Sequence, residues 1–397
     1  MTDRADVVVQ WAGSRATGTI RDGIQRVVAG IGLLGDDLTV VIACAGAGDG
    51  EATESPGGPA TIVPIDTAPL DRIPMITALP RDPYRTLFTL GRRHDARALL
   101  MLGTGDDQLT PGMVASLVRP LIADAVDVVT PGYQRQIFDG LLNAAVVSPL
   151  TRALYGRRVN GQLGLDFGFS ARVAQRWGIG DEEVPVTRPV WLLPQAVADD
   201  MHICEVPVPV RLPPTPESID LSALLSHVLG SLFTDLEPRA PFWQRVVRSR
   251  AVPAIGRVDA DAHATTTPVD VRPMIDSFGL AYRNLQSVWP LVLPPATLVE
   301  LKRLTLADPA RFRLDDGLWA RIVYDFALAH RLRTINREHL LRAFVPLYLA
   351  WVASYATDAQ RGTRAMADAR LEQLCQAFEH EKPYLVRRWR WPDRFNP

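Results

Sequence analysis

The sequence predicts an α/β domain over residues 1–216, followed by a helical domain over residues 217–397. The N-terminal part alternates strand, helix and strand over Asp6–Gln10, Ile20–Gly30 and Leu38–Ala43, an order that favours a parallel sheet. Prolines crowd the stretch just before residue 217, which indicates an extended boundary. From Asp220 onward, apolar residues recur at helical spacing. A chain of 397 residues is also longer than one hydrophobic core usually serves.

The composition is that of an ordinary globular protein, with 47% hydrophobic and 22% charged residues. A net charge of -1 without basic clusters argues against nucleic acid and membrane surfaces as partners. Lys302 and Lys382 are the only lysines, which excludes a Schiff-base lysine from the first domain. Cys44, Cys204 and Cys375 have no metal-ligand spacing, as expected in a reducing compartment. No signal-peptide pattern and no run of ~18 apolar residues occurs, so we expect a soluble cytoplasmic protein.

Further along the first domain, strands and helices continue to alternate. Ala98–Leu102 reads as a buried central strand, and Ile203–Val206 reads as an edge strand. Ser55–Pro83 is rich in Pro and Gly, so we expect a long, partly mobile loop around a short strand at Thr61–Val63. The other expected elements are a helix at Tyr84–Arg93, a helix at Gly112–Ile122, a strand at Val126–Val129, an apolar segment of helical spacing at Leu141–Tyr155 and a helix near Trp191–Leu193.

The second domain reads as helix after helix. One stripe of apolar residues along Arg337–Ala356 predicts a core-facing helix, in which Pro346 should cause a kink or shift the start. The predicted helices are Leu221–Leu236, Asp276–Val288, Pro295–Leu304, Asp315–Leu332, Arg337–Ala356 and Arg364–Glu379.

Two adjacent carboxylates, Asp106 and Asp107, follow the central strand at its carboxyl end. In that place they could bind a divalent cation through oxygen ligands, or one of them could accept a proton. The alternative is that Asp107 or Thr110 caps the next helix and Asp106 is solvated.

The stretch Pro131–Ser170 gathers most of the chain's polar and special-geometry residues, which is typical of a site wall. Tyr133, Arg135 and Asp139 emerge from the end of a strand, and the phrase Asp166-Phe-Gly-Phe-Ser ends a loop marked by glycines at 156, 161, 164 and 168. Glycine lets the backbone approach a ligand closely. Alternatively, Asp166 caps a helix that starts near Ala171 and the aromatic residues are core.

One further candidate is a histidine. His202, beside the edge strand, has the chemistry of a proton shuttle, although a lone histidine there is more often a surface or core residue.

Three segments of the chain resemble sequences of one known family. They are DGLLNAAVVSPLTRALYGRRVNGQLGLDFGFS, Trp191-Leu192 before HICEVPVPV, and DDGLWARIVYDFALAHRLRTINREHLLRAFVPLYLAWVASY. Together they resemble the GT-A glycosyltransferases of the mannosylglycerate synthase and glucosyl-3-phosphoglycerate synthase type. The resemblance covers most of the chain and implies a GT-A-like, Rossmann-like nucleotide-sugar domain, a helical C-terminal domain and a homodimer.

At the positions where that family has polar residues that bind the nucleotide sugar and the metal ion, this chain has other residue types. The acidic residue after the second strand falls on Cys44, the glycine-loop lysine near Pro80 and the late histidine near Pro213. The Asp-x-Asp metal motif falls on Gly103 and Gly105, whereas a spacing shifted by one residue gives Thr104 and Asp106. A single carboxylate without histidine leaves a hard cation mostly hydrated. We therefore expect no metal and no cofactor, the alternative being a nucleotide sugar with Mg²⁺ or Mn²⁺.

These observations lead to three hypotheses for function. The first is an enzyme of specialised metabolism that has lost metal-dependent sugar transfer and performs metal-independent acid/base chemistry, such as dehydration, conjugate addition or cyclisation, on a small molecule. Its expected catalytic residues are Asp166, His202 and Asp106, and its expected substrate-binding residues are Tyr133, Arg135, Asp139 and Asp107. The second is a glycosyltransferase in which Arg135, Arg157 or Arg158 replaces the cation. The third is a non-catalytic protein that acts on a partner through an apolar patch of its helical domain.

Overall fold

The computed structural model describes residues 4–11, 20–45, 60–65, 83–105, 107–123, 125–160, 162–163, 166–177, 192–211, 220–256 and 269–391. The chain forms two compact units, each with its own interior. Unit 1 comprises Met1–Gln134, Val159–Leu212 and Ala251–Asp261, and unit 2 comprises Arg135–Arg158, Pro213–Arg250 and Ala262–Pro397. The predicted boundary at 216 lies close to the division at 212/213, but the sequence did not indicate that residues 135–158 group with the later helices.

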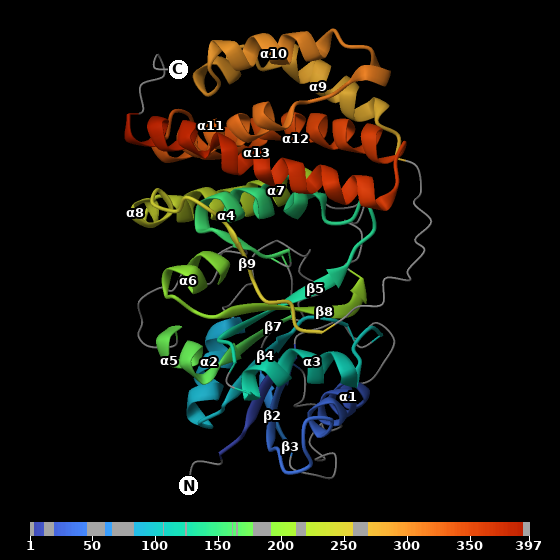
Figure 1. Cartoon of the computed structure of the whole chain (residues 1–397), viewed down its shortest axis with the longest axis vertical. Helices are drawn as coiled ribbons and strands as arrows, with labels where there is room; N and C mark the ends of the chain where they lie inside the picture. The colour runs from blue at the N-terminus through green and yellow to red at the C-terminus, as the bar shows by residue number, and fades with distance from the viewer. Residues whose placement is uncertain are drawn as a thin grey trace. The chain divides into compact units, whose positions relative to one another are not determined.

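Unit 1 is an α/β fold around a mostly parallel, 7-stranded sheet of order β3-β2-β1-β4-β7-β5-β8 (Figure 1). Every pairing is parallel except those of β7, which runs antiparallel to both β4 and β5. The strands are β1 (Val7–Trp11), β2 (Val40–Ala45), β3 (Ala60–Ile65), β4 (Ala98–Leu102), β5 (Val128–Gln134), β7 (Phe167–Ser170) and β8 (Ile203–Arg211). Of these, β7 was not predicted, and β8 is an edge strand as predicted.

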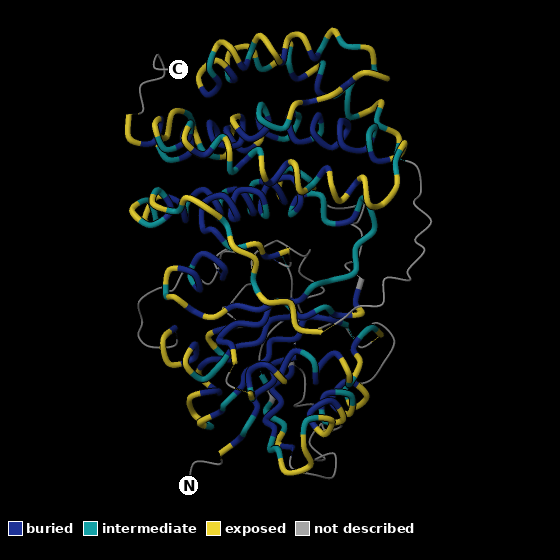
Figure 2. The backbone as a smooth tube through the Cα atoms, viewed as in Figure 1, coloured by how far each residue is buried: buried dark blue, intermediate teal, exposed yellow. Residues whose placement is uncertain are grey.

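Helices cover both faces of this sheet. Helices α1 (Ile20–Gly32) and α3 (Pro111–Ile122) pack together over one face, where Val9, Ile42 and Leu100 belong to one buried core. Helices α2 (Pro83–Arg93) and α5 (Ala171–Trp177) pack over strands β4 and β7 with an aromatic cluster of Tyr84, Phe88, Phe169 and Trp177. A short helix, α6 (Leu192–Ala198), precedes β8. The central strands β1 and β4 are buried along their whole length (Figure 2), as their apolar runs predict.

The glycine in the middle of β7 is required by packing. A Cβ at Gly168 would lie 2.8 Å from Cδ1 of Leu121 and 3.2 Å from Cβ of Val129. Gly168 therefore lets α3 approach the sheet, so the close approach expected of this glycine is made by the protein's own side chains rather than by a ligand.

Unit 2 is helical. Its long helices are α7 (Leu221–Leu236), α9 (Arg272–Asn284), α10 (Pro295–Thr305), α11 (Asp316–Leu332), α12 (Arg337–Ala359) and α13 (Arg364–Arg390), and its short elements are α8 (Ala240–Trp243), η3 (Trp289–Leu291) and η4 (Pro309–Arg311). The predicted stripe of α12 is buried, with Leu340, Phe344 and Trp351 at most 1% exposed. Pro346 does not end this helix, which starts at Arg337 as predicted.

The segment 135–158 joins the helices of unit 2. It contains a π-helix, η2 (Asn143–Val147), then α4 (Ser148–Tyr155) and β6 (Arg157–Arg158), which pairs with β9 (Arg250–Ala251). Trp319 Nε1 donates to the backbone oxygen of Ala145 at 2.9 Å, and Lys382 Nζ donates to that of Ala153 at 2.8 Å. Donors from α11 and α13 thus satisfy backbone carbonyls of this segment.

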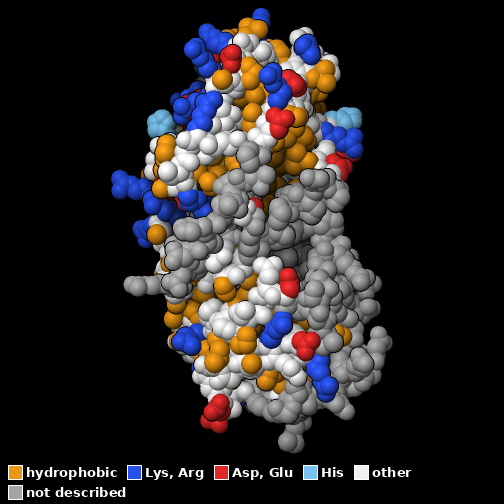
Figure 3. Space-filling view, turned by 90° about the vertical axis from the view of Figure 1, so that its right-hand side faces the viewer, with side chains coloured by type: hydrophobic (Ala, Val, Ile, Leu, Met, Phe, Trp, Pro, Cys, Tyr) orange, Lys and Arg blue, Asp and Glu red, His pale blue; other side chains and the backbone are white. Residues whose placement is uncertain are grey.

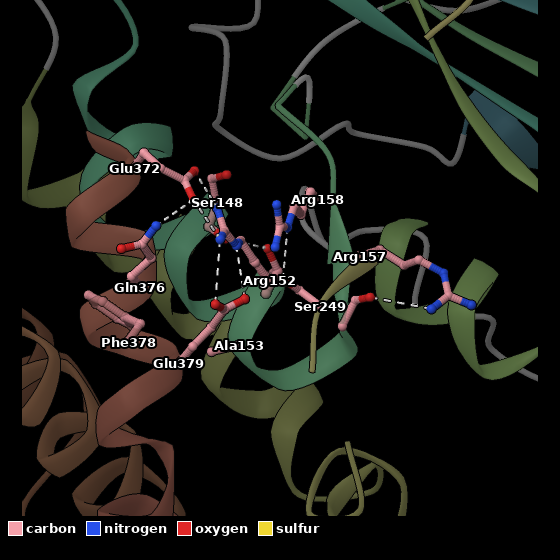
Figure 4. A network of polar contacts seen from close by, with 12 residues as sticks. Ser148, Arg152, Ala153, Arg157, Arg158, Ser249, Glu372, Gln376, Phe378 and Glu379 are labelled. Atoms are coloured by element: carbon pink, nitrogen blue, oxygen red, sulfur yellow. Dashed lines mark hydrogen bonds and ion pairs between the residues drawn. The ribbon is translucent and has the colours of Figure 1, made fainter. Parts of the chain in front are cut away.

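A buried arginine adds ion pairs between α4 and α13 (Figure 4). Arg152, with a side chain 5% exposed, donates to Glu372 Oε2 at 2.6 Å from Nη1 and to Glu372 Oε1 at 2.8 Å from Nη2. Its Nε donates to Glu379 Oε1 at 2.9 Å. A bidentate guanidinium–carboxylate pair fixes geometry more strongly than a single contact does.

Apolar side chains reach the surface of the helical unit on the face shown in Figure 3. Large apolar residues of unit 2 that are exposed include Leu280, Leu291, Val299 and Leu306. In the described part of the chain, only α12 is long and apolar enough to cross a membrane, and 72% of its apolar window is buried inside the protein. A core helix of a soluble protein has the same length and composition.

Candidate functional site

The carboxyl edge of the unit 1 sheet has a point where the strand order changes direction. From β1, strands β2 and β3 follow on one side, whereas β4 lies on the other. Ligands of open parallel sheets bind outside the carboxyl ends of the strands at such a switch point. Here the two strand ends are the register partners Trp11 and Leu102. Trp11 Nε1 donates to the backbone oxygen of Thr104 at 3.1 Å and so ties the loop after β4 to β1.

Asp166 lies at this same edge because β7 runs antiparallel to β4 and begins where β4 ends. Its Oδ1 accepts from the backbone N–H groups of Gly103 at 2.9 Å and Thr104 at 3.0 Å. Its Oδ2 accepts from Thr104 Oγ1 at 2.6 Å and from the Tyr133 hydroxyl at 2.7 Å. The backbone N–H of Asp166 donates to the same Tyr133 hydroxyl at 3.1 Å. One carboxylate thus joins the loop after β4, the start of β7 and the end of β5.

The environment of Asp166 makes its carboxylate more basic than a surface one. Its side chain is 1% exposed. Burial raises the pKa of Asp166, and the hydrogen bonds from Thr104, Tyr133 and Gly103 oppose that rise. Tyr133, whose hydroxyl donates to Asp166, is itself only partly buried. A raised carboxyl pKa beside a phenol is a typical arrangement for moving a proton.

Asp166 does not cap the following helix. That helix, α5, begins at Ala171 as expected, but the carboxylate bonds the loop after β4 instead. Phe167 and Phe169 are buried core residues, which confirms the structural interpretation of these aromatics.

The aspartates after β4 are only partly described. Asp106 lies outside the described residues, and Asp107 is exposed in a turn. Thr110 is the residue that caps α3, since its Oγ1 accepts from the backbone N–H of Met113 at 3.2 Å. The helix cap at this position is therefore the threonine rather than Asp107.

His202 lies at the opposite edge of the sheet. Its backbone N–H donates to Asp127 Oδ2 at 2.9 Å, just before β5 and β8 begin side by side. Its side chain is 80% exposed, with Nδ1 3.6 Å from the same carboxylate. The structure therefore does not bring His202 together with Asp166, because the length of the strands separates the two edges.

Arg135 and Asp139 belong to unit 2, whereas Tyr133 and Asp166 belong to unit 1. Arg135 Nη2 lies 3.4 Å from Asp368 Oδ1. Asp139 Oδ2 accepts from the backbone N–H of Gln136 at 2.9 Å and closes a local turn. The residues expected to form one wall are thus divided between two units.

The described residues at this edge do not fit a divalent cation. Each oxygen of Asp166 already accepts two hydrogen bonds, so a cation would have to displace donors. The Thr104 hydroxyl is itself bonded to Asp166. No group of three or more His, Cys, Asp or Glu side chains suited to a metal ion occurs among the residues that the structure describes.

Trp11 was missed by the sequence reasoning, because the first strand was expected to end at Gln10. Thr104 was considered only as a metal ligand. The available signal was position, since Trp11 ends one apolar strand and Thr104 lies two residues after the end of a neighbouring parallel strand.

Comparison with known proteins gives similarity at the level of solved structures. No family model matches the chain, and no curated protein matches it. The chain is similar to a structure described as that of a mycobacterial protein, with 18% identity over 58% of this chain and 74% of that chain, at a TM-score of 0.38. It is also similar to Rv0371c of Mycobacterium tuberculosis H37Rv in complex with manganese, with 15% identity over 53% of this chain and 92% of that chain, at a TM-score of 0.29. A second structure of Rv0371c has 14% identity over 60% of this chain and 100% of that chain, at a TM-score of 0.28.

Proposed function

We propose that the chain is an enzyme that moves protons on a small molecule at the carboxyl edge of the unit 1 sheet. In this proposal Asp166 is the base, and Tyr133 stands between Asp166 and the substrate. The observation that carries it is the contact of 2.7 Å between the Tyr133 hydroxyl and Asp166 Oδ2, a carboxylate whose pKa burial raises, beside the switch point of the sheet.

The step is a coupled transfer of two protons. A proton leaves the substrate for the Tyr133 hydroxyl oxygen while the phenolic proton moves to Asp166 Oδ2, and the substrate keeps the electron pair. Reversal delivers a proton to a leaving hydroxyl or to a carbanion. Dehydration, conjugate addition and cyclisation all contain such steps, and general acid/base catalysis contributes roughly 10²–10⁴-fold to rate.

The scaffold of this proposed enzyme is GT-A-like, without metal-dependent sugar transfer. Cys44 and the glycines at 103 and 105 stand where the resemblance implies an acidic donor contact and metal ligands. Replacing charged contacts with small or apolar residues suits a less polar ligand. Both oxygens of Asp166 already accept hydrogen bonds, which supports chemistry without a metal ion at this carboxylate.

Proton exchange tests the chemistry before the product is known. We expect the protein in D₂O to incorporate deuterium into members of a panel of ketones, β-hydroxy acids and enoates, as followed by mass spectrometry. Tyr133→Phe and Asp166→Asn should each slow incorporation by roughly 10²-fold or more. Tyr155→Phe is the matched control, because the Tyr155 hydroxyl also contacts a buried carboxylate, Asp235 at 3.0 Å, but lies in unit 2. Equal exchange by wild type and Tyr133→Phe, or none by wild type, would contradict the proposal.

A ligand screen separates the two other hypotheses. UDP- and GDP-sugars, with and without Mg²⁺ or Mn²⁺, are tested by thermal shift and calorimetry. A ligand at 100 times its dissociation constant stabilises a protein by about 2.7 kcal/mol. Metal-dependent binding would favour the glycosyltransferase, and indifference to every small molecule would favour the non-catalytic partner protein.

A further inference from the structure

Three segments of unit 2 meet at one end of its helices, where α8 and the last turns of α13 lie (Figure 1). The segments are 238–251, 330–337 and 382–391, and none of them contains Asp or Glu. Arg390 Nε donates to Gln244 Oε1 at 2.8 Å, and Arg331 Nη1 donates to the backbone oxygen of Trp389 at 2.7 Å. The last turns of α13 therefore contact both of the other segments.

Six exposed arginines of these segments have no carboxylate partner in the part of the chain that the structure describes. We call them the arginine edge; they are Arg245, Arg248, Arg250, Arg333, Arg387 and Arg390. Other arginines of the same segments are ion-paired, as Arg239 is with Asp235. Salt screens charges beyond about 8–10 Å, so the uncompensated edge decides what binds there, whatever the net charge of -1 for the whole chain. The sequence showed no basic cluster because the fold brings these arginines together.

Large apolar side chains are exposed among these arginines. Val247 is 87% exposed, Trp391 is 71% exposed and Leu332 is 42% exposed. Val247 lies in the stretch from α8 to β9, which is largely exposed (Figure 2). Of the tryptophans that the structure describes, only Trp391 is exposed. Exposed apolar groups beside a charged rim are typical of a surface that contacts a protein or a membrane.

We propose that the arginine edge docks the protein on the surface of an anionic phospholipid membrane. Guanidinium groups bind phosphate through paired hydrogen bonds, and anionic lipids attract basic side chains near the surface. Tryptophan favours the membrane–water interface, and burial of Val247 and Leu332 in its apolar part removes them from water. A nucleic acid would pair with the arginines but leave those two aliphatic side chains in water. This docking does not depend on proton transfer at Asp166.

Co-sedimentation with vesicles tests the docking. The full chain should bind vesicles made of equal parts phosphatidylglycerol and phosphatidylcholine, but not vesicles of phosphatidylcholine alone. Each arginine near an anionic surface contributes a factor of roughly five to the partition coefficient, so Arg248→Gln with Arg387→Gln should lower it roughly 25-fold. Arg272→Gln with Arg283→Gln is the matched control, because both are exposed arginines without a carboxylate partner in the described residues but lie on α9. No binding to the anionic vesicles, equal binding to both kinds, or an equal loss in the control overturns the inference.

Fluorescence quenching shows whether the apolar side chains enter the bilayer. Brominated phosphatidylcholine in the anionic vesicles should quench the wild type, and Trp391→Phe should lose most of that quenching, since the other described tryptophans are buried. The Tm of every variant without vesicles should equal that of the wild type, because exposed side chains are replaced. Vesicle binding without quenching of Trp391, or duplex DNA or single-stranded RNA bound more tightly than the vesicles, would assign the arginine edge to another polyanion and overturn the inference. Either result leaves the proton transfer proposed at Asp166 untouched.

Discussion

Two buried aspartates fix β7, one at each end. Asp166 bonds the loop after β4 where β7 begins. At the other end, Asp127 accepts from Ser170 Oγ at 3.1 Å and from Arg172 Nη1 at 2.9 Å. Carboxylates that accept several donors hold short strands whose own ladder bonds are few. Only Asp166 belongs to the candidate site, because only the carboxyl edge of the sheet coincides with the point where the strand order changes direction.

The first prediction concerns what Asp166 holds together. Asp166→Ala should lower the free energy of unfolding by about 3 kcal/mol or more, because it leaves two backbone N–H groups and two hydroxyls without their buried acceptor. Asp166→Asn keeps Oδ1 for the backbone donors, and both hydroxyls can rotate, so its cost should be about 1 kcal/mol. Urea unfolding measures both. Equal losses for the two variants would show that the carboxylate's charge, rather than its acceptor geometry, is what the fold requires.

A second prediction at this scale concerns pH. His330 in α11 is 3% exposed, and its Nδ1 has no partner in the described part of the chain. Burial, aided by the positive charge of Arg337, lowers the pKa of His330 to about 4. Between pH 4 and 6.5 the unfolded state therefore binds more protons, so this contribution to stability is lost as the pH falls through that window, by at most ~1.4 kcal/mol per pH unit.

The comparison of His330→Leu with wild type isolates this effect. Asp325 in the same helix acts in the opposite sense, since burial raises its pKa to about 7 and favours its protonated form in the folded state. Taking the difference between variant and wild type at each pH cancels that contribution. The wild type should lose stability relative to the variant between pH 6.5 and 4. A difference that does not change with pH would refute the assignment to His330.

At the scale of elements, the sequence predicts what period and composition encode. The helix Leu221–Leu236 and the strand Ala98–Leu102 have the predicted bounds, because apolar repeats and their flanking residues are local signals. Strand β7 was not predicted, because Asp166-Phe-Gly-Phe-Ser is short and contains glycine. Its partner strands β4 and β5 are also distant in sequence. The candidate site was predicted only in part for the same reason. The sequence identified Asp166 as a candidate, but its hydrogen bonds to Gly103 and Tyr133 join residues that are distant in sequence.

The π-helix before α4 is a further feature beyond the sequence signal. Apolar spacing over Leu141–Tyr155 predicts helix but does not distinguish hydrogen bonds to the fourth residue from those to the fifth. Trp319 Nε1 donates a hydrogen bond to the backbone carbonyl oxygen of Ala145 inside η2. A side chain from α11 thus satisfies a backbone acceptor of the π-helix. Side-chain donors of this kind allow such turns to persist.

Gly156, which ends α4, gives the prediction for this scale. It is left-handed with φ of 67°, and a Cβ there would lie 2.8 Å from Val246 Cγ1 and 2.9 Å from the backbone oxygen of Arg248. Gly140 has a similar φ of 62° but no atom within 4 Å of an added Cβ. Gly140→Ala should therefore cost only the left-handed strain, about 1 kcal/mol, while Gly156→Ala adds overpacking and should cost about 2–4 kcal/mol.

Urea midpoints of the two glycine variants, with unchanged m-values, are the measurement. Equal losses would mean that the chain around Val246 and Arg248 moves aside at no cost, and the tight end of α4 would then not be a packing constraint.

At the scale of the whole molecule, the chain is not two domains in series. Unit 1 draws on three separate stretches of sequence, and so does unit 2. A boundary at 216 assigns residues 135–158 to the first domain, where sequence order suggests they belong. Their buried hydrogen bonds and ion pairs to α11 and α13 assign them to the helices instead. Cooperative units follow contacts rather than sequence order.

Native-state hydrogen exchange tests this assignment through Arg152. Arg152→Ala leaves Glu372 and Glu379 without their shared cation, so we expect the opening free energies of amides in both α4 and α13 to fall together. The side chains of the two glutamates are 47% and 27% exposed and regain water, so the loss should be about 1.5–2 kcal/mol. Amides in β1 and β4 should keep their protection. Arg342→Ala is the matched control, because Arg342 and Glu338 form a pair whose side chains are 62% and 63% exposed, and its loss should cost less than about 1 kcal/mol. If amides of α4 follow those of β5 in rising urea, residues 135–158 unfold with the sheet, and the chain divides near residue 216 after all.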